Sequence, residues 1–233
     1  MGAWFDTFKD KFYNDFIKDD RWRYLWEGLG VTLQITFFAI IIGIVLGFII
    51  AVIRSTHDMT GKMKVGNAIC KFYLTIFRGT PVVVQLMIIY FVIFAAVDID
   101  KTFVAVIAFG LNSAAYVAEI FRSGIMSLDR GQFEASRSLG LNYPRTMISV
   151  IMPQAFKNVL PALANEFIVL LKETSVSGYI ALQDLTKAGD IIKGRTFDPL
   201  LPLIAVALIY LILVVGLSAL VSRLERRLRN SDH

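Results

Sequence analysis

The chain has 233 residues, of which 56% are hydrophobic and 18% charged, and its mean hydropathy is +0.61. A soluble domain of this length is less apolar and more charged, so the composition argues against an ordinary cytosolic enzyme. The formal net charge of +5 could indicate nucleic-acid binding, but in so apolar a chain it more often marks basic residues on the cytoplasmic side of a membrane. The single cysteine, Cys70, cannot form an internal disulfide, and His57 and His233 lie too far apart in sequence to suggest a metal site.

The first 27 residues mix aromatic side chains with balanced charges. A phenylalanine recurs every three or four residues, which predicts an amphipathic helix that lies on the outer leaflet or docks on another subunit. A second aromatic group follows where an interfacial belt would anchor the first membrane span. The phenylalanines are Phe5, Phe8, Phe12 and Phe16, and the belt residues are Trp22, Tyr24 and Trp26.

Five apolar runs are candidates for membrane spans. The surest has 23 uncharged residues, enough at about 1.5 Å per residue to cross a core of roughly 30 Å. It begins too late and is too long for a signal peptide, so we expect it to be retained. Its Gly43 and Gly47 form a G-x-x-x-G pattern that favours close helix packing within the subunit. The five runs are residues 31–53, 80–97, 102–118, 159–182 and 199–222.

The fourth run is less clear, because Glu166, Lys172 and Glu173 interrupt it. Charges at membrane depth are costly and usually face a cavity or a partner helix. The alternative is a short buried helix that ends at Lys172. A spanning helix is favoured because five spans give a consistent charge asymmetry between the two sides.

With five spans, the loops alternate between the two sides of the membrane. One side carries 14 of the 24 basic residues with 5 acidic ones, and the other carries 9 basic and 11 acidic residues. The positive-inside rule then places the N-terminus outside and the C-terminus in the cytoplasm. The basic side holds residues 54–78, 122–157 and 223–233, and the other holds residues 1–27, 98–101 and 184–198.

The loop over residues 127–154 carries the strongest functional signal. Asp129 stands at a capping position three residues before Gln132, and Gly140 suits a left-handed helix stop. Asn142 and Pro144 favour a second helix start. The loop is therefore predicted to be an ordered helix, turn and helix, which is typical of a docking surface. The alternative is an interfacial helix that merely covers the bundle.

Several short motifs in the chain match one family. Glu134-Ala135-Ser136, then Gly140, then Val150-Ile151-Met152-Pro153 resembles the EAA loop of permease subunits of ATP-binding-cassette importers, with Ser136, Val150 and Met152 as mild departures. Together the motifs resemble the polar amino acid branch, of the histidine, glutamine and arginine permease type, over about residues 28–229. The supporting motifs are Arg78-Gly79-Thr80-Pro81 with Gln85-Leu86, residues 115–122, and residues 160–166.

The resemblance implies partners and a coupling mechanism. It implies two permease subunits, identical or different, a cytoplasmic ATPase dimer and an external solute-binding protein that delivers the amino acid. No G-x-x-x-x-G-K-[ST] loop occurs in the sequence, so we expect no cofactor in this chain, with ATP and Mg²⁺ held by the ATPase. By resemblance, residues 130–139 form the coupling helix that sits in a groove of the ATPase. The implied coupling residues are Arg130, Glu134, Ala135, Ser136, Leu139 and Gly140.

A substrate path through the bundle needs polar groups inside the spans. Asn112, Tyr116 and Glu119 fall on one helical face, with Ser113 beside them. A zwitterionic amino acid needs an acceptor for its ammonium and donors for its carboxylate, which such residues provide. Alternatively, Glu119 pairs with Arg122, and Glu166 ties the fourth span to a neighbouring helix. The second polar set is Asn165, Glu166 and Lys172.

The prediction is therefore an all-α, multi-pass protein of the cytoplasmic membrane with five spans, embedded in the lipid bilayer and without nucleic-acid or metal partners. Residues 1–27 form an external segment, residues 28–222 the importer domain, and residues 223–233 a basic cytoplasmic tail. The alternatives are import of another small polar solute such as an opine or cystine, or a secondary transporter, which usually needs a longer chain or inverted repeats. An intramembrane enzyme is disfavoured because no Ser/His, HExxH or paired-Asp arrangement lies at membrane depth.

Overall fold

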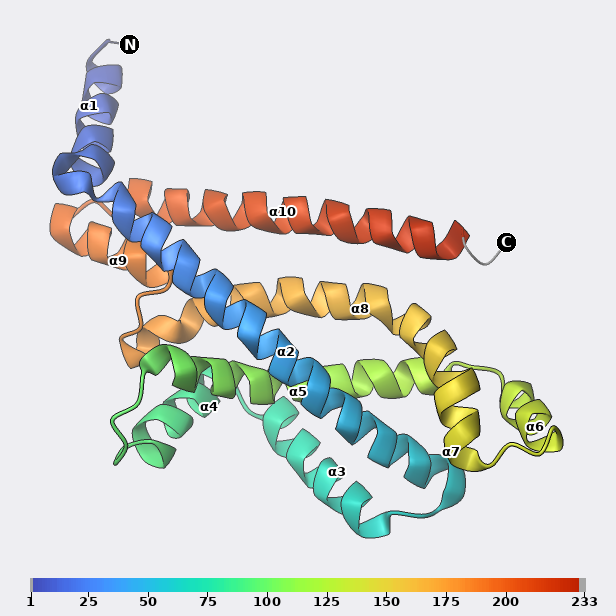
Figure 1. The fold of residues 1–233 in the computed structure, drawn as a ribbon. Coiled ribbons are helices and arrows are strands. Elements are labelled where there is room, and N and C mark those ends of the chain that lie inside the picture. The colour runs from blue at the N-terminus through green and yellow to red at the C-terminus, as the bar shows by residue number, and fades with distance from the viewer. Residues whose placement is uncertain (1, 231–233) are drawn as a thin grey trace. The chain divides into compact units, whose positions relative to one another are not determined.

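The computed structural model describes the backbone of residues 2–230 and the side chains of residues 6–228. All regular elements in this part of the chain are helices (Figure 1). In chain order they are α1 (Gly2–Phe12), η1 (Tyr13–Ile17), η2 (Lys18–Asp20), α2 (Trp22–Thr60), α3 (Lys64–Gly79), α4 (Val82–Ile88), η3 (Ile89–Ile93), α5 (Lys101–Met126), α6 (Arg130–Ser138), α7 (Tyr143–Thr146), η4 (Met147–Ile151), α8 (Met152–Glu173), η5 (Thr174–Ile180), α9 (Leu185–Thr196) and α10 (Leu200–Asn230).

Four helical stretches in the described residues are long and apolar enough to cross a membrane. A fifth span exists only if α3 and the α4–η3 segment, which meet at a break, count as one. The expected fourth span, residues 159–182, lies largely within a continuous helical stretch, and its Lys172 and Glu173 close α8. The four stretches are Trp22–Thr60, Lys101–Met126, Tyr143–Ile180 and Leu200–Leu228.

The expected second span, residues 80–97, is wrong as a single helix. Thr80 is extended (φ −126°, ψ 150°), and helix resumes only over Val82–Ile93. Twelve residues reach about 18 Å, which is short of a hydrocarbon core of roughly 30 Å. Pro81 explains the break, because it lacks a backbone N–H and disfavours helical geometry at the preceding residue.

Residues 54–78 were expected to be a loop, but α2 continues to Thr60 and α3 begins at Lys64. The sequence search for uncharged runs passed over α3 because Lys64, Lys71 and Arg78 recur along it. The helix is nevertheless amphipathic, with one buried and one exposed face. The buried residues are Asn67, Cys70 and Leu74, and the exposed apolar residues are Val65, Ile69, Phe72 and Ile76.

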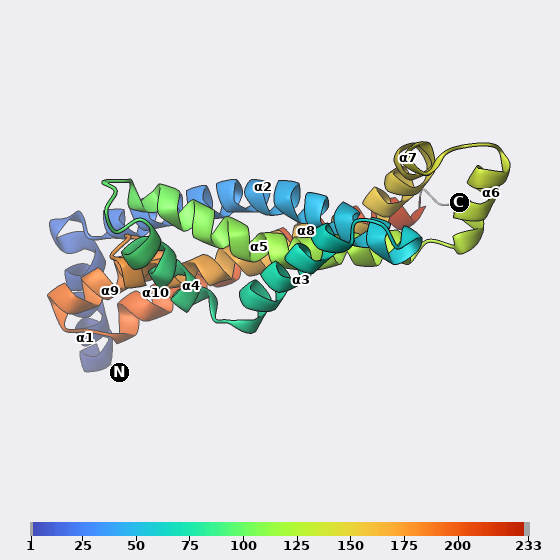
Figure 2. The same ribbon diagram turned by 90° about the horizontal axis from the view of Figure 1, so that it is seen from below.

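The chain divides into two compact units. Unit 1 comprises Met1–Phe38, Val82–Phe109 and Ile168–Leu217. Its apolar cluster joins the N-terminal segment to α9 and the start of α10, and the views of Figures 1 and 2 agree that α9 lies beside the segment joining α1 to α2. The cluster consists of Phe16, Leu25, Leu185, Ala188, Ile192 and Val206.

Of the phenylalanines expected on one amphipathic face, Phe16 is buried in that cluster, whereas Phe8 and Phe12 are exposed. The side chain of Phe5 lies outside the described residues. Trp22 and Trp26 are exposed, as an interfacial belt requires, and Arg195 stacks over the ring of Tyr24 at 5.0 Å. Of the three predicted phenylalanines whose side chains are described, two are exposed and Phe16 is buried inside unit 1.

Unit 2 comprises Ala39–Pro81, Gly110–Phe167 and Ser218–His233. Its α2 and α5 segments pack very closely, because a Cβ placed on Gly43 would lie 2.9 Å from Ser113 Oγ and one on Gly47 would lie 2.7 Å from Val117 Cγ1. The predicted G-x-x-x-G packing within the subunit is thus confirmed for this unit. An aromatic cluster joins α2, α5 and α8 nearby, formed by Phe48, Phe121 and Phe156.

Candidate functional site

The helix α6 is fixed at both ends by its own sequence. Asp129 caps it, accepting a hydrogen bond of 2.9 Å from the backbone N–H of Gly131. Gly140 has a φ of +81°, a left-handed conformation that side chains rarely adopt. Its N–H donates to the carbonyl of Arg137 at 2.9 Å. Both predicted helix signals are confirmed, so α6 is a short rigid helix.

The segment after α6 ties it to the rest of unit 2. Asn142 accepts a hydrogen bond of 3.1 Å from the N–H of Arg145 and so caps α7. The hydroxyl of Tyr143 lies 3.3 Å from Thr56 Oγ1 and 3.7 Å from Met59 Sδ, both near the end of α2. The apolar cluster beneath this segment consists of Ile125, Met147, Ile151 and Ala155.

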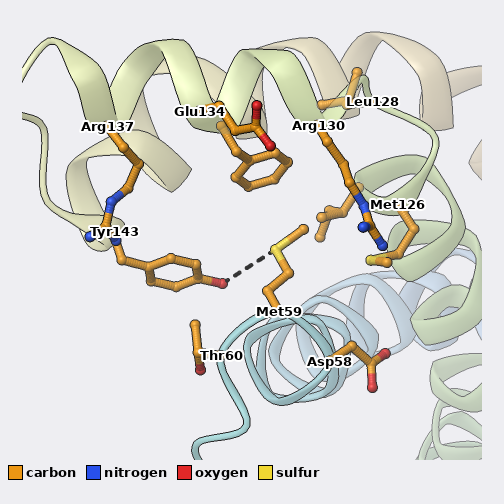
Figure 3. Close-up of a pocket in the computed structure, with 11 residues that line it drawn as sticks. Asp58, Met59, Thr60, Met126, Leu128, Arg130, Glu134, Arg137 and Tyr143 are labelled. Carbon is orange, nitrogen blue, oxygen red and sulfur yellow. Dashed lines mark hydrogen bonds between the residues drawn. The ribbon is translucent and has the colours of Figure 1, made fainter.

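A cavity of about 420 Å³ lies between α6, α7 and the ends of α2 and α5. Arg130 and Arg137 extend from α6 toward the end of α2, with Glu134 between them (Figure 3). These residues stand at positions i, i+4 and i+7 and therefore share one helix face. The cavity wall also contains apolar and aromatic side chains, namely Met59, Ile125, Met126, Leu128, Phe133 and Tyr143.

The opposite face of α6 is small and open. Ala135 is exposed, and Leu139, at the C-terminal end of the helix, is 83% exposed. Ser136 is buried and returns its hydroxyl to the carbonyl of Gln132 at 2.7 Å. The predicted coupling residues therefore lie on two faces of α6. Arg130 and Glu134 line the cavity, whereas Ala135 and Leu139 lie on the face that points away from it.

A second polar site in unit 2 is built around Glu119 on α5. Arg54 of α2 is hydrogen-bonded and ion-paired with Oε1 of Glu119. Arg122 reaches Oε2 at 3.2 Å, which confirms the predicted pairing, and also lies 3.6 Å from Asp58. Arg78 of α3 lies 3.8 Å from Oε1. One carboxylate is therefore shared by three guanidinium groups.

An open cavity of about 450 Å³ adjoins this cluster. Arg54, Lys71 and Arg78 line it together with Glu119, so its wall carries more positive than negative charge. The guanidinium of Arg78 also lies 5.8 Å from the centre of the Tyr116 ring, a cation–π contact. Such a wall offers donors for an anionic group, while Glu119 has its oxygens already engaged.

Two other predicted pathway residues, Ser113 and Glu166, are buried against each other. The hydroxyl of Ser113 donates to Glu166 Oε1 at 2.8 Å, which joins α5 to α8. Asn112 is also buried, and its side-chain amide donates to the carbonyl of Phe77 at 3.4 Å. This geometry favours the alternative in which Glu166 ties two helices together.

Of the remaining predicted residues, Gly79 lines the same cavity as Glu119. Asn165 and Lys172 are exposed on α8, and Gln85 is buried on α4. Gly79 ends α3, and Thr80 donates from its hydroxyl to the carbonyl of Ile76 at 2.8 Å just before Pro81. The Arg78-Gly79-Thr80-Pro81 motif thus marks the break between α3 and α4.

A third polar site lies in unit 1, where Asp184 is buried and caps α9. It accepts hydrogen bonds of 3.1 Å from the backbone N–H groups of both Thr186 and Lys187. Burial raises the pKa of Asp184 to about 6, against the opposing effect of these hydrogen bonds. The chain passes so closely here that a Cβ on Gly28 would lie 2.7 Å from the Asp184 carbonyl oxygen.

The sequence search missed Arg54, Lys71 and Arg137, which the structure places at the two cavities. The contact between Arg54 and Glu119 joins positions 65 residues apart, and no local pattern signals it. Arg137 was detectable, because it lies three residues beyond Glu134 on the same helical face. Among the described residues, no group of three or more His, Cys, Asp or Glu side chains is placed to hold a metal ion.

Comparisons with known proteins identify the family. The model of the family described as "Binding-protein-dependent transport system inner membrane component" matches residues 40–230. The arginine transport system permease protein ArtQ of Bacillus subtilis is 40% identical over 211 residues, covering 90% of this chain and 94% of the relative. The putative glutamine transport system permease protein GlnP of Rickettsia bellii is 38% identical, covering 87% and 91%.

A solved structure gives the same result. The crystal structure of an amino acid ABC transporter with histidines matches with a TM-score of 0.80 and 42% identity, covering 88% of this chain and 94% of that chain. The predicted family is therefore confirmed. The chain belongs to the inner-membrane permease components of binding-protein-dependent transport systems, multi-pass membrane subunits that are not themselves enzymes.

Proposed function

We propose that this chain is the permease subunit of an ATP-driven importer that moves a polar α-amino acid across the cytoplasmic membrane by alternating access. The observation that carries the mechanism is α6, a helix capped at both ends whose outer face is left open. The family requires an ATPase and a binding protein in general terms. We infer a complex of two permease copies, an ATPase dimer holding ATP and Mg²⁺, and one external binding protein.

In this proposal α6 is the coupling helix. Its open face, with Ala135 and Leu139, sits in a groove of the ATPase, since small residues let the helix backbone approach closely. Asp129 and Gly140 fix the helix ends, so movement of the ATPase is transmitted as movement of a rigid rod. Arg130 and Glu134 act from the other face, where they line the cavity next to α2 and α5.

We further propose that the N-terminus is external and the C-terminus cytoplasmic. Support comes from the charge distribution, because residues 122–157 and 223–233, on the α6 side, carry nine basic residues against four acidic ones. Residues 1–27 then form an external segment, residues 28–222 the importer domain and residues 223–233 a cytoplasmic tail. Counting α3 with the α4–η3 segment as one span gives the odd number of spans that this orientation needs.

The substrate path is proposed to pass the basic cavity beside Glu119. The α-carboxylate of an amino acid fits Arg78 and Lys71, whose side chains are exposed in that cavity. Tyr116 is partly exposed and lies next to Arg78. In this proposal Glu119 holds Arg54 and Arg78 in position, while Ser113 and Glu166 hold α5 and α8 together.

The substrate class follows from the shared chemistry of the relatives. ArtQ is named for arginine and GlnP for glutamine, two solutes that share an α-amino and an α-carboxylate group but differ in side chain. A substrate path that recognises these shared groups would also admit a related solute, such as an opine or cystine. ATP-driven uptake into proteoliposomes, screened with arginine, glutamine, histidine and cystine and the cognate binding protein, identifies the substrate.

The coupling assignment is tested by Gly140→Asp. The variant places a side chain at φ +81° where α6 ends, and we expect loss of ATPase association and of uptake. Gly61→Asp is the matched control, because Gly61 has φ +67° and open space around it but lies in the turn between α2 and α3. Wild-type uptake by the Gly140→Asp complex would show that α6 is not the coupling helix.

The substrate path is tested by Arg78→Gln and Glu166→Gln in the assembled complex. We expect Arg78→Gln to raise the KM for uptake with unchanged yield of the complex. Glu166→Gln is expected to lower the yield without changing KM, because Glu166 is buried against Ser113. The opposite pattern would move the substrate path from the Arg78 cavity to the α5–α8 contact.

A further inference from the structure

The segment before α2 is anchored on the corner between α9 and α10. We call residues 2–21 the N-terminal arm; it lies outside the family match, which begins at residue 40. Phe16 enters the apolar cluster of unit 1, and Lys11 Nζ lies 3.0 Å from Asp198 Oδ2. The arm ends at a sharp corner, where Asp19 and Asp20 have φ values of 56° and 54°. Phe16 thus gives the docked arm an apolar contact, and Lys11 gives it a charged one.

Asp15 lies inside this contact with an unusual environment. Its side chain is fully buried, and neither carboxylate oxygen accepts a hydrogen bond from any described residue. The Thr196 hydroxyl lies beside it, but that hydroxyl donates its only proton to the carbonyl of Ile192 at 3.0 Å. The Thr196 side chain lowers the pKa of Asp15, but by less than burial raises it. A buried ionised carboxylate without a donor costs several kcal/mol, by order of magnitude.

The charged groups around Asp15 are already engaged elsewhere. They are Lys11 on α1, Arg21 at the start of α2 and Asp198 before α10. Asp198 uses Oδ1 to accept from the N–H of Leu200 at 2.9 Å and Oδ2 to bind Lys11. Arg21 gives one guanidinium nitrogen to the carbonyl of Asn14 and another to Asp19 at 2.9 Å. Nε of Arg21 is buried without a hydrogen-bond partner, and Oδ2 of Asp198 makes only the ionic contact with Lys11 among the described residues.

We propose that the N-terminal arm is a proton-dependent latch, docked on the Thr196–Leu200 corner while Asp15 is a neutral acid and released when Asp15 loses its proton. As a neutral acid, Asp15 donates its own proton to an acceptor of Asp198 or Thr196 and needs no donor in return. When that proton leaves to water, the carboxylate must draw Lys11 from Asp198, or Arg21 from Asn14 and Asp19. Drawing Lys11 away breaks the ion pair that holds the arm to Asp198. Drawing Arg21 away breaks its contacts with Asn14 and Asp19, which shape the end of the arm.

The sign of the pH effect follows from the burial of Asp15. Burial raises its pKa above the ordinary 3.8 and the Asp198 carboxylate raises it further, whereas Thr196, Lys11 and Arg21 lower it by less. A raised pKa means that the docked state binds the proton more tightly than the released state. Docking is therefore stable at low pH and is lost as the pH rises through the raised pKa. With the N-terminus external, as proposed above, the arm faces the external medium and responds to its pH; this last step rests on the proposed orientation.

The experiment uses the full chain in lipid nanodiscs with a spin label on the arm. The label is attached at Asp10→Cys, an exposed position on α1, in a Cys70→Ser background, and its mobility is measured from about pH 3.5 to about pH 8.5. We expect an immobile label at low pH and a mobile one at high pH. With Asp15→Asn, which is neutral at every pH, the transition is expected to disappear and the label to stay immobile.

The matched control is Asp190→Asn on α9, a carboxylate that binds Lys187 and Lys193 and makes no contact with the arm among the described residues. It should keep the wild-type profile. Asp15→Ser provides a second measurement if Asp15→Asn folds poorly: it also removes the titrating carboxylate, so its label should show no transition either. A wild-type label whose mobility ignores pH, or an Asp15→Asn profile equal to wild type, would overturn the latch. Neither result bears on uptake or on α6.

Discussion

Glu119 in unit 2 and Asp15 in unit 1 are both acidic residues removed from water, yet their surroundings are opposite. The Glu119 side chain is 25% exposed and is reached by Arg54, Arg78 and Arg122. Asp15 is fully buried, and no described group donates to its oxygens. The difference shows that the number of donors within reach, and not burial alone, decides whether a carboxylate is held ionised.

The same contrast recurs within α9. Asp184 is buried, and burial raises its pKa to about 6 although backbone N–H groups and the Thr186 side chain donate to it, whereas Asp190 is bound by Lys187 and Lys193 and its pKa is lowered to about 2. Capping thus does not by itself compensate for lost hydration. Five substitutions test this account, and we take them from the site with the largest expected effect to the site with the smallest.

The largest effect is expected for Glu119→Gln. The substitution leaves Arg54, Arg78 and Arg122 without their common anion, and repulsion among unpaired guanidinium groups in a partly buried site should lower the free energy of unfolding by about 3 kcal/mol. Thermal unfolding in detergent measures the loss, and uptake should fall with it. A fully stable variant with a higher KM would instead make Glu119 a direct substrate contact.

Arg54→Gln and Arg122→Gln separate the members of that cluster. The Arg54 side chain is 14% exposed and that of Arg122 is 30% exposed, so the contact of Arg54 is less screened by water. We expect Arg54→Gln to cost about 2 kcal/mol and Arg122→Gln about 1 kcal/mol. If both variants lost the same melting temperature, the burial of each arginine would not determine how much its contact stabilises the protein.

Asp184→Asn should change the pH dependence of stability. In the wild type, the folded state holds its proton up to about pH 6, so stability falls as the pH rises from the ordinary pKa of 3.8 through that value. Asparagine keeps a cap acceptor without the charge, so the variant should match wild type near pH 4 and exceed it by about 1 to 2 kcal/mol near pH 8. Melting curves across this range that stay parallel would contradict a raised pKa for Asp184.

Asp190→Asn is expected to have the smallest effect. Its partners Lys187 and Lys193 are only half-buried, and such surface pairs contribute about 0.5 kcal/mol at neutral pH. The contribution should vanish below about pH 2, where Asp190 takes up a proton. If the same melting curves showed a loss of more than about 1 kcal/mol in the free energy of unfolding, the contacts of Asp190 with the two lysines would be stronger than ordinary surface ion pairs.

Local signals in the sequence predicted the parts of the fold that depend on neighbouring residues. Asp129 and Gly140 bound α6 because a cap acceptor and a left-handed stop act within a few positions. The long uncharged runs likewise predicted α2 and α10. Gly43 and Gly47 signalled close packing, since their spacing places both on one helix face.

Contacts between distant segments could not be predicted in this way. Arg54 and Glu119 lie 65 positions apart, and the docking of Asp15 beside Asp198 brings together the two ends of unit 1. The helix α3 was not predicted because Lys71 interrupts its apolar residues, and a search for uncharged runs ends a span at any charge. Neither a search for uncharged runs nor a count of charges in each loop can show which charged residues line a cavity.

The glycines of α2 also restrict how unit 2 can move. Gly43 and Gly47 hold α5 at a distance where any Cβ would clash with Ser113 or Val117. A slide of one helix along the other by a single residue, about 1.5 Å, would drive a larger side chain into each notch. We therefore expect these segments of α2 and α5 to travel through the transport cycle as one rigid body, with the bending of the subunit confined to other joints.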